Sequence, residues 1–130
     1  MKNVTTFFIA VLVFTVLCGC SNSTNYGCFD EYVYAVHVTL MDFERGQPIM
    51  GGKPTGTVRE GNYTDSMIIA HRSDETGDYT MLWGAGERAG KYSVSVQVEG
   101  YEPWTKENIY VSRDDCHVIP QKITAFLKKK

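Results

Sequence analysis

An alternation of apolar and polar residues with a period of two is the feature that most limits how this chain can fold. Residues 92–98, YSVSVQV, place an apolar side chain at every second position. Successive side chains of a β-strand point to opposite faces, so this pattern predicts a strand with one buried face and one solvated face. Val36, Val38 and Leu40 follow the same rule and predict another strand over residues 33–41.

Turn-forming residues cut the remaining chain into similarly short segments. Glycine, proline, asparagine and aspartate are concentrated at residues 51–54, 60–62, 74–78 and 84–86. The segments around these turns predict further strands at residues 55–59, 64–71, 79–83, 108–112 and 117–127. Pro120 in the last of them favours an edge strand or a bulge, because proline has no backbone N–H to give to a sheet.

Seven short strands without a convincing helix predict an all-β fold. Two half-polar sheets bury their apolar faces best against each other, so we expect a seven-stranded Greek-key β-sandwich. A small closed barrel is the alternative architecture.

The N-terminal residues carry a separate signal. Lys2 provides a positive start, residues 7–17 are apolar except for Thr15, and the chain turns polar after Cys20. This order is that of a secretory signal, and the apolar run is shorter than the roughly 20 residues of a membrane-spanning helix. The run ends in LCGC at residues 17–20, which resembles the bacterial lipoprotein box.

This resemblance implies that Cys20 becomes the lipidated first residue of the mature protein. Its thiol can form a thioether with a diacylglyceryl group, and several acyl chains give a stable membrane anchor. A plain secretory signal with incidental cysteines is the alternative. Ser21 agrees with sorting to the outer membrane if the source has two membranes, whereas a bacterium with one membrane would hold the protein on the outer face of its plasma membrane.

The expected domain organisation is a signal peptide at residues 1–19, a lipidated tether at 20–31 and one sandwich domain at 32–130. Removal of the signal leaves 111 residues, which is close to the common size of a single domain. The formal net charge of the chain is −2, and loss of Lys2 makes it −3. A small negative net charge gives no support to a nucleic-acid partner.

The four cysteines constrain the compartment and the covalent structure. Cys18 leaves with the signal and Cys20 takes the lipid, which leaves Cys28 and Cys116 as an even pair in an exported protein. We therefore predict a disulfide between Cys28 and Cys116. Two free thiols, or part of a metal site, are the alternatives.

Three motifs resemble those of a known family. They are GQPI at residues 46–49, SDETGDY at 73–79, and GKYSVSV at 90–96 followed by Gly100-Tyr101. They look like the carboxypeptidase regulatory-like domain, and the similarity covers nearly all of residues 32–127. The resemblance implies a transthyretin-like sandwich in which Tyr92 and Tyr101 are scaffold residues. The glycine-rich segment 50–62 and the cysteine pair depart from the usual pattern of that family.

Sequence motifs for catalysis or metal binding are missing. No zinc-site spacing such as His-Glu-x-x-His occurs, and His37, His71 and His117 are scattered over three predicted strands or strand ends. There is no Gly-x-Ser-x-Gly nucleophile motif. The chain also lacks the Tyr-Arg-Gly-Ser tail of hydroxyisourate hydrolases and the His-x-His pair of intradiol dioxygenases, which use related sandwiches. We predict no catalytic residue, metal or cofactor, and a small hydrolase is the alternative.

Trp104 and Tyr101 are the candidate ligand contacts. They lie in a polar connection with a proline, residues 101–107, where a large ring can be exposed to an envelope protein or a glycan. We expect most other aromatic rings to lie in the core. The sequence therefore predicts a non-catalytic envelope lipoprotein, held to the membrane by Cys20, with a binding or structural sandwich module.

Overall fold

The computed structural model describes residues 27–75 and 77–130. Throughout this part of the chain the fold is all-β. The strands are β1 (Tyr34–Asp42), β2 (Thr55–Glu60), β3 (Tyr63–Ser66), β4 (Ile68–Asp74), β5 (Gly77–Gly86), β6 (Gly90–Gln97), β7 (Trp104–Val111) and β8 (Gln121–Leu127). The described residues include no helix with the length and apolar character of a membrane span. The predicted signal peptide and Cys20 lie outside the described residues.

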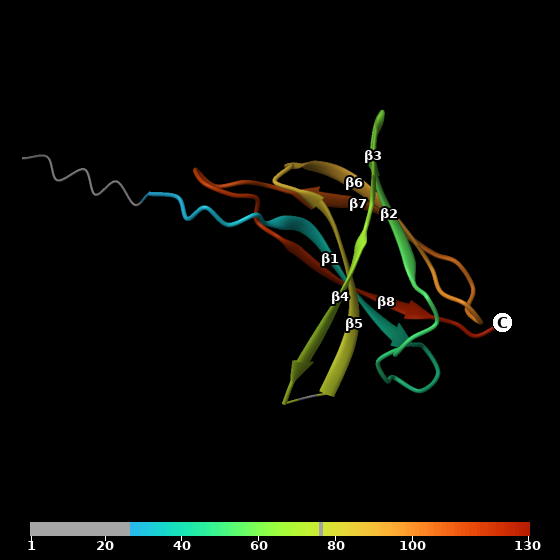
Figure 1. Ribbon diagram of the computed structural model, residues 1–130. Coiled ribbons are helices and arrows are strands. Elements are labelled where there is room, and N and C mark those ends of the chain that lie inside the picture. The colour runs from blue at the N-terminus through green and yellow to red at the C-terminus, as the bar shows by residue number, and fades with distance from the viewer. Residues whose placement is uncertain (1–26, 76) are drawn as a thin grey trace, which may run out of the picture.

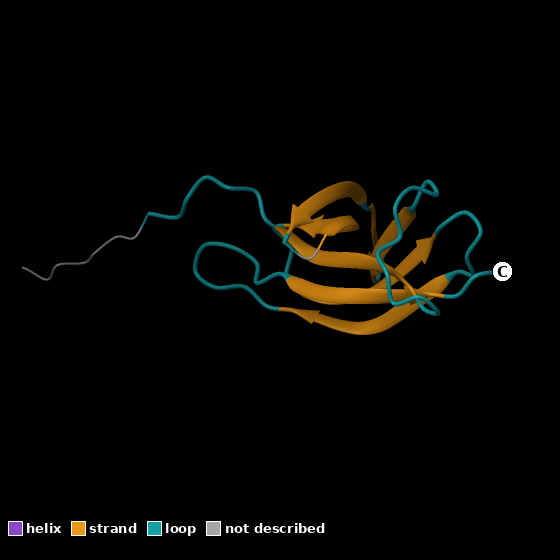
Figure 2. Ribbon diagram, turned by 90° about the horizontal axis from the view of Figure 1, so that it is seen from below, coloured by secondary structure: helices purple, strands orange, loops and turns teal. Residues whose placement is uncertain are grey.

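The strands form two four-stranded sheets packed as a sandwich (Figure 1, Figure 2). The strand order is β4-β5-β1-β8 in one sheet and β3-β2-β6-β7 in the other. β1 and β8 pair in parallel, whereas the other neighbouring strands are antiparallel. The first and last strands therefore lie side by side and run in the same direction. Two separate sheets agree with the predicted sandwich and not with the closed barrel.

The predicted alternation builds the core between the sheets. Val36, Val38 and Leu40 of β1 are fully buried and belong to the same apolar cluster as Val94 and Val96 of β6. The residues between them on each strand are partly or fully exposed. Burial of each such aliphatic side chain stabilises the folded state by about 1.5–3 kcal/mol, so these two strands supply much of the hydrophobic stabilisation.

The predicted single strand over residues 64–71 is wrong, because this segment forms two strands in different sheets. β3 pairs with β2, whereas β4 pairs with β5, and Figure 1 shows β3 and β4 as one nearly continuous path. Met67 forms the corner between them. Its N–H donates to the carbonyl of Gly56 at 2.9 Å, and its side chain is buried. This crossing raises the number of strands from the expected seven to eight.

Two further predicted strands have different bounds. β7 begins at Trp104 and not at residue 108, and a bulge interrupts its pairing with β6 between Tyr92 and Val94. Trp104 is therefore the first residue of a strand and not part of a connection. β8 begins at Gln121, so Pro120 precedes the strand, and β8 is an edge strand as the proline favours.

Gly56 and Gly84 allow close packing around the corner residue Met67. A Cβ atom on Gly56 would lie 2.8 Å from the Met67 sulfur and 2.9 Å from Leu82 Cδ1. A Cβ atom on Gly84 would lie 3.0 Å from Met67 Cγ. These separations are shorter than normal contacts in a packed interior, so the corner requires a residue without a side chain at both positions.

Candidate functional site

The predicted disulfide joins Cys28 to Cys116, with their Cα atoms 5.2 Å apart. It attaches the segment that enters β1 to the loop that precedes β8. Asp114 orders this loop, since its Oδ1 accepts hydrogen bonds from the N–H groups of Cys116 and His117, both at 2.8 Å. The point at which the tether meets the domain is thus covalently fixed.

A charged clamp, made by His117 and Glu87, holds the same two segments. His117 Nδ1 lies 2.8 Å from Glu87 Oε1, and His117 Nε2 lies 2.9 Å from the carbonyl oxygen of Phe29. Glu87 Oε1 also accepts a hydrogen bond from the Val33 N–H at 2.8 Å. Carboxylate and carbonyl oxygens only accept hydrogen bonds, so both ring nitrogens must donate and the ring is an imidazolium.

The clamp shifts the protonation equilibria of both partners. The hydrogen bond from His117 to Glu87 is the main cause of the raised pKa of His117. The Val33 N–H is the main cause of a lowered pKa for Glu87, and the contact with His117 lowers it further. Both shifts favour the charged forms, so the clamp is an ion pair at mildly acidic pH and remains one to a higher pH than an isolated histidine would allow.

Trp104 and Tyr101, the candidate ligand contacts, differ in how their rings are engaged. Trp104 is partly buried against the core and lines a depression of about 220 Å³ together with Phe126 and Lys128. Tyr101 is also partly buried, and its hydroxyl donates to Asp42 Oδ2 at 3.0 Å. Trp104 therefore keeps a ring edge beside an open depression, whereas the polar atom of Tyr101 is already bonded within the domain.

Asp42, at the end of β1, collects several hydrogen bonds although it is only 4% exposed. Its Oδ1 accepts from the N–H groups of Glu44 and Arg45 at 3.0 and 2.9 Å, and Lys129 Nζ lies 3.7 Å from Oδ2. The Arg45 N–H is the main cause of a lowered pKa for Asp42. With the Tyr101 hydroxyl as a fourth partner, this carboxylate fastens the last residues of the chain to the end of β1.

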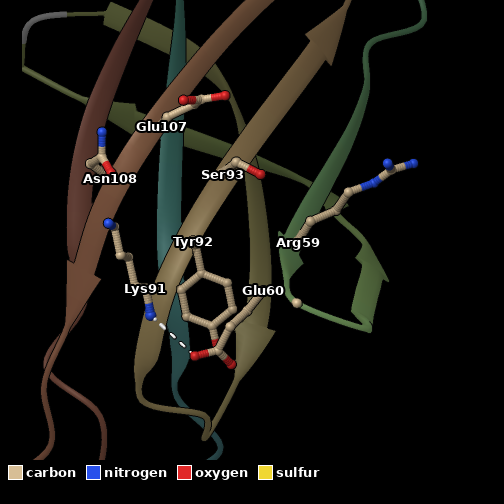
Figure 3. A pocket seen from close by; sticks show the side chains of 8 residues that line it. Arg59, Glu60, Lys91, Tyr92, Ser93, Glu107 and Asn108 are labelled. Atoms are coloured by element: carbon tan, nitrogen blue, oxygen red, sulfur yellow. Dashed lines mark hydrogen bonds between the residues drawn. The ribbon is translucent and has the colours of Figure 1, made fainter.

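An open depression of about 340 Å³ lies over β2, β6 and the bulged part of β7 (Figure 3). Glu60 is fixed at its rim, because its Oε1 accepts from the Lys91 N–H at 3.2 Å and its Oε2 lies 3.0 Å from Arg88 Nη2. Figure 3 shows the Arg59 side chain pointing away from the others, while Glu107 projects from β7. The charges around the depression are mixed and favour no single class of ligand.

The outer surfaces of the two sheets differ sharply in composition. We call the outer surface of β3-β2-β6-β7 the polar face. Its outward positions, which alternate with the buried ones, are Thr64, Ser66, Thr55, Thr57, Arg59, Lys91, Ser93, Ser95, Gln97, Thr105 and Tyr110. Hydroxyl and charged groups dominate this surface, as expected for the solvated side of a sandwich sheet.

We call the outer surface of β4-β5-β1-β8 the aromatic face. Its outward positions are Ile68, Ala70, Arg72, Tyr79, Met81, Trp83, His37, Thr39, Met41, Lys122, Thr124 and Phe126. Seven of these twelve residues are apolar or aromatic, and the same alternation gives β4 one further outward position, Asp74, opposite Gly77 at the end of the surface. Phe43 and Lys128 extend the surface just past β1 and β8, with the Lys128 ammonium 5.0 Å from the centre of the Phe43 ring.

Trp83 lies in the middle of the aromatic face and not in the core. Its ring stacks on His37 with the centroids 5.0 Å apart, and its indole N–H is buried with no hydrogen-bond partner among the described residues. Burial is the main cause of a lowered pKa for His37, to which the nearby Lys122 charge adds. His37 is therefore a neutral ring at neutral pH, in keeping with the apolar character of its surroundings.

Sequence reasoning missed the aromatic face because its members are distributed over four strands. A usable signal was nevertheless present in β1, where Met41 and Phe43 are apolar at the positions that alternate with Val38 and Leu40. A strand with apolar residues on both sides is unusual for a sheet with one solvated surface.

The three histidines have separate surroundings. His37 stacks on Trp83, His71 lies on β4 opposite Thr80, and His117 belongs to the clamp. Within residues 27–75 and 77–130, no group of three His, Cys, Asp or Glu side chains is arranged to hold a metal ion.

Comparison with known protein families and with curated proteins finds no match to this chain.

Proposed function

We propose that this protein is a non-catalytic lipoprotein of the bacterial cell envelope, anchored by lipid on Cys20 and carrying a binding or structural sandwich. The observation that supports the anchor best is the pairing of the other cysteines. Cys28 and Cys116 are bonded to each other, so neither occupies the thiol of Cys20. That thiol ends the LCGC sequence, which has the form of a lipoprotein box.

The proposed module is a Greek-key, transthyretin-like sandwich of the carboxypeptidase regulatory-like type. In support, the hydroxyl of Tyr92 donates to the Arg88 carbonyl at 2.9 Å and that of Tyr101 donates to Asp42. These contacts suit the scaffold roles that the family resemblance gives to both tyrosines. Gly100 has a φ of 83°, a conformation that favours glycine, at the turn that precedes Tyr101.

The anchor limits where a partner can lie. Cys28 lies eight positions after Cys20, and eight residue steps span at most about 26–29 Å when fully extended. The disulfide prevents further lengthening at Cys28, because it ties this residue to the domain. Any glycan or envelope protein bound by the module must therefore lie close to the membrane surface, which is the outer membrane if the source has two membranes.

Metabolic labelling with a fatty acid tests the anchor. We expect Cys20→Ala to abolish labelling and to release the protein from the membrane fraction, because the thioether has no other acceptor. Cys18→Ala is the matched control, since it removes a cysteine two residues away that is discarded with the signal. Labelling that survives in Cys20→Ala, or that is lost in Cys18→Ala instead, would contradict the proposal.

Crosslinking in intact cells tests the binding role. A protein or glycan that is recovered with the anchored chain and lost with Cys20→Ala would support a module that acts at the membrane surface. Recovery of the same partner with the released chain would show that binding does not need the anchor. Recovery of no partner with either chain would leave a purely structural role for the module.

A further inference from the structure

We propose that the aromatic face docks on an anionic lipid surface, namely the bilayer that holds the Cys20 anchor. This inference rests on the proposed lipid anchor, which would keep the domain beside a membrane. It assigns a partner to the side of the sandwich on which the described residues expose Ile68, Phe126 and Phe43.

The first argument is the exposure of large apolar groups on one side of the molecule. Ile68 is 45% exposed, Phe126 is 50% exposed and Phe43 is 55% exposed. Trp83 lies in the same row as Ile68 in the strand register, with His37 and Lys122 completing this row across the four strands. Exposed apolar groups gathered on one side of a sandwich mark a candidate interaction surface.

The second argument is the sign of the charges among these apolar groups. Lys122 lies at the outward position beside His37, and Lys128 lies over the ring of Phe43. With Arg72 of β4 these lysines make three positive charges on the aromatic face, against the one negative charge of Asp74 at the end of β4. Aromatic rings mixed with lysines are the composition that suits the headgroup level of a bilayer, where rings enter the interface and ammonium groups meet lipid phosphates.

This charge pattern argues against a second copy as the occupant. Two aromatic faces in contact would bring together four ammonium groups, from Lys122 and Lys128 of each copy, and only two carboxylates, from Asp74 of each copy. Buried charges without partners are strongly destabilising. The polar face has no comparable apolar surface, so the two sides of the sandwich have different partners: water on one side and lipid on the other.

The third argument is the reach of the chain between the anchor and the domain. The eight residue steps from Cys20 to Cys28 are long enough, at about 26–29 Å, for the domain to lie with either sheet against the bilayer. The anchor therefore does not dictate the orientation. The aromatic face determines the orientation, because the anchor holds this face at a high effective concentration beside the lipid surface.

Quenching of tryptophan fluorescence by brominated lipids tests the orientation directly. The chain has two tryptophans, of which Trp83 lies on the aromatic face and Trp104 lines a depression beside Phe126 and Lys128. Trp104→Phe leaves Trp83 as the only reporter, and Tyr110→Trp combined with Trp83→Phe and Trp104→Phe places the only reporter on the polar face. We use the lipidated protein in vesicles of phosphatidylglycerol and phosphatidylethanolamine, with bromine near the carbonyl end of the acyl chains.

We expect the fluorescence of Trp83 to be quenched at least about twofold more than that of the tryptophan introduced at position 110, because aromatic rings at the interface approach the upper acyl chains. Lys122→Gln combined with Lys128→Gln should reduce the quenching of Trp83 to the level of this reference tryptophan. Lys91→Gln combined with Lys106→Gln is the matched control, since it removes the same charge from the other sheet and should change nothing. Thermal unfolding of each variant verifies that it is folded.

Equal quenching of the two tryptophans would overturn the inference. Equal quenching of Trp83 in vesicles of phosphatidylcholine alone would overturn the assignment to an anionic surface. A dimer seen by sedimentation that is lost with Phe126→Ser, with Trp83 unquenched, would assign the face to a second copy instead.

Mass spectrometry of the Cys20 peptide from the same sample separates this inference from the proposed function. A peptide without acyl chains would refute the anchor. The quenching measurement would then be made with the unlipidated chain and excess vesicles, where it decides on the aromatic face alone.

Discussion

Replacing both Cys28 and Cys116 with serine should lower the free energy of unfolding by about 4–5 kcal/mol. The disulfide joins residues 88 apart, and the loop-entropy relation for a closed loop of this length gives roughly 4.6 kcal/mol at 25 °C. The serines add little cost of their own, because Cys28 is exposed and Cys116 is only partly buried. The predicted loss is a large part of the 5–15 kcal/mol that typically stabilises a domain.

This magnitude assumes that the bond acts on the unfolded chain and leaves the folded geometry unchanged. The structure supports this assumption, because the clamp of His117 with Glu87 and with the Phe29 carbonyl still joins the two segments when the disulfide is absent. Urea unfolding followed by circular dichroism gives the free energies of the two proteins. Reduction of the native protein should reproduce the loss, and the reductant should have no effect on the serine variant.

A loss below about 2 kcal/mol would refute the reasoning, because it would mean that the unfolded chain already confines these two segments. A loss well above about 5 kcal/mol would show that the folded state itself depends on the bond, since the relation accounts only for chain entropy.

Three further predictions concern two side chains, Tyr92 and His117. Tyr92→Phe should cost about 1 kcal/mol, because it removes the buried hydrogen bond from the hydroxyl to the Arg88 carbonyl, and urea unfolding measures this. Burial raises the pKa of Tyr92 to about 12, so absorbance at alkaline pH should show its hydroxyl ionising after the exposed tyrosines. A raised pKa makes the stabilisation from His117 complete below about pH 6.5 and lost as pH rises through the folded-state value. The melting temperature should therefore fall between pH 6 and 9 in the native protein and change less in His117→Gln, and equal pH profiles would contradict the role of the clamp.

The strands that could be predicted are those with one face buried and the other exposed to solvent. In β6 the buried positions Val94 and Val96 alternate with polar residues, and the sequence shows this directly. β7 was recognised only in its second half, because residues 104–107 belong to an edge strand with a bulge and are mostly polar. The boundary between β3 and β4 could not be predicted, because the apolar corner residue Met67 looks like the continuation of a strand.

The site could be predicted only in its covalent part. Counting cysteines was sufficient to predict the disulfide, because the expected signal and lipid anchor account for Cys18 and Cys20 and leave one pair of cysteines. The clamp could not be predicted, since Glu87 and His117 are 30 residues apart and meet only through the packing of two loops. The aromatic face depends likewise on the register of β5 beside β1, which brings Trp83 next to His37.

The disulfide also decides how the molecule carries a mechanical load. Tension applied between the anchor and the C-terminus enters at Cys28, crosses the bond to Cys116 and continues only through the residues that follow it. β1 to β7 lie inside the closed loop, so the covalent path of the load does not run along them, and β8, which is on that path, is already extended and is paired with β1. A load applied in this way therefore lengthens the protein very little, and it does not pull the rest of the sandwich apart.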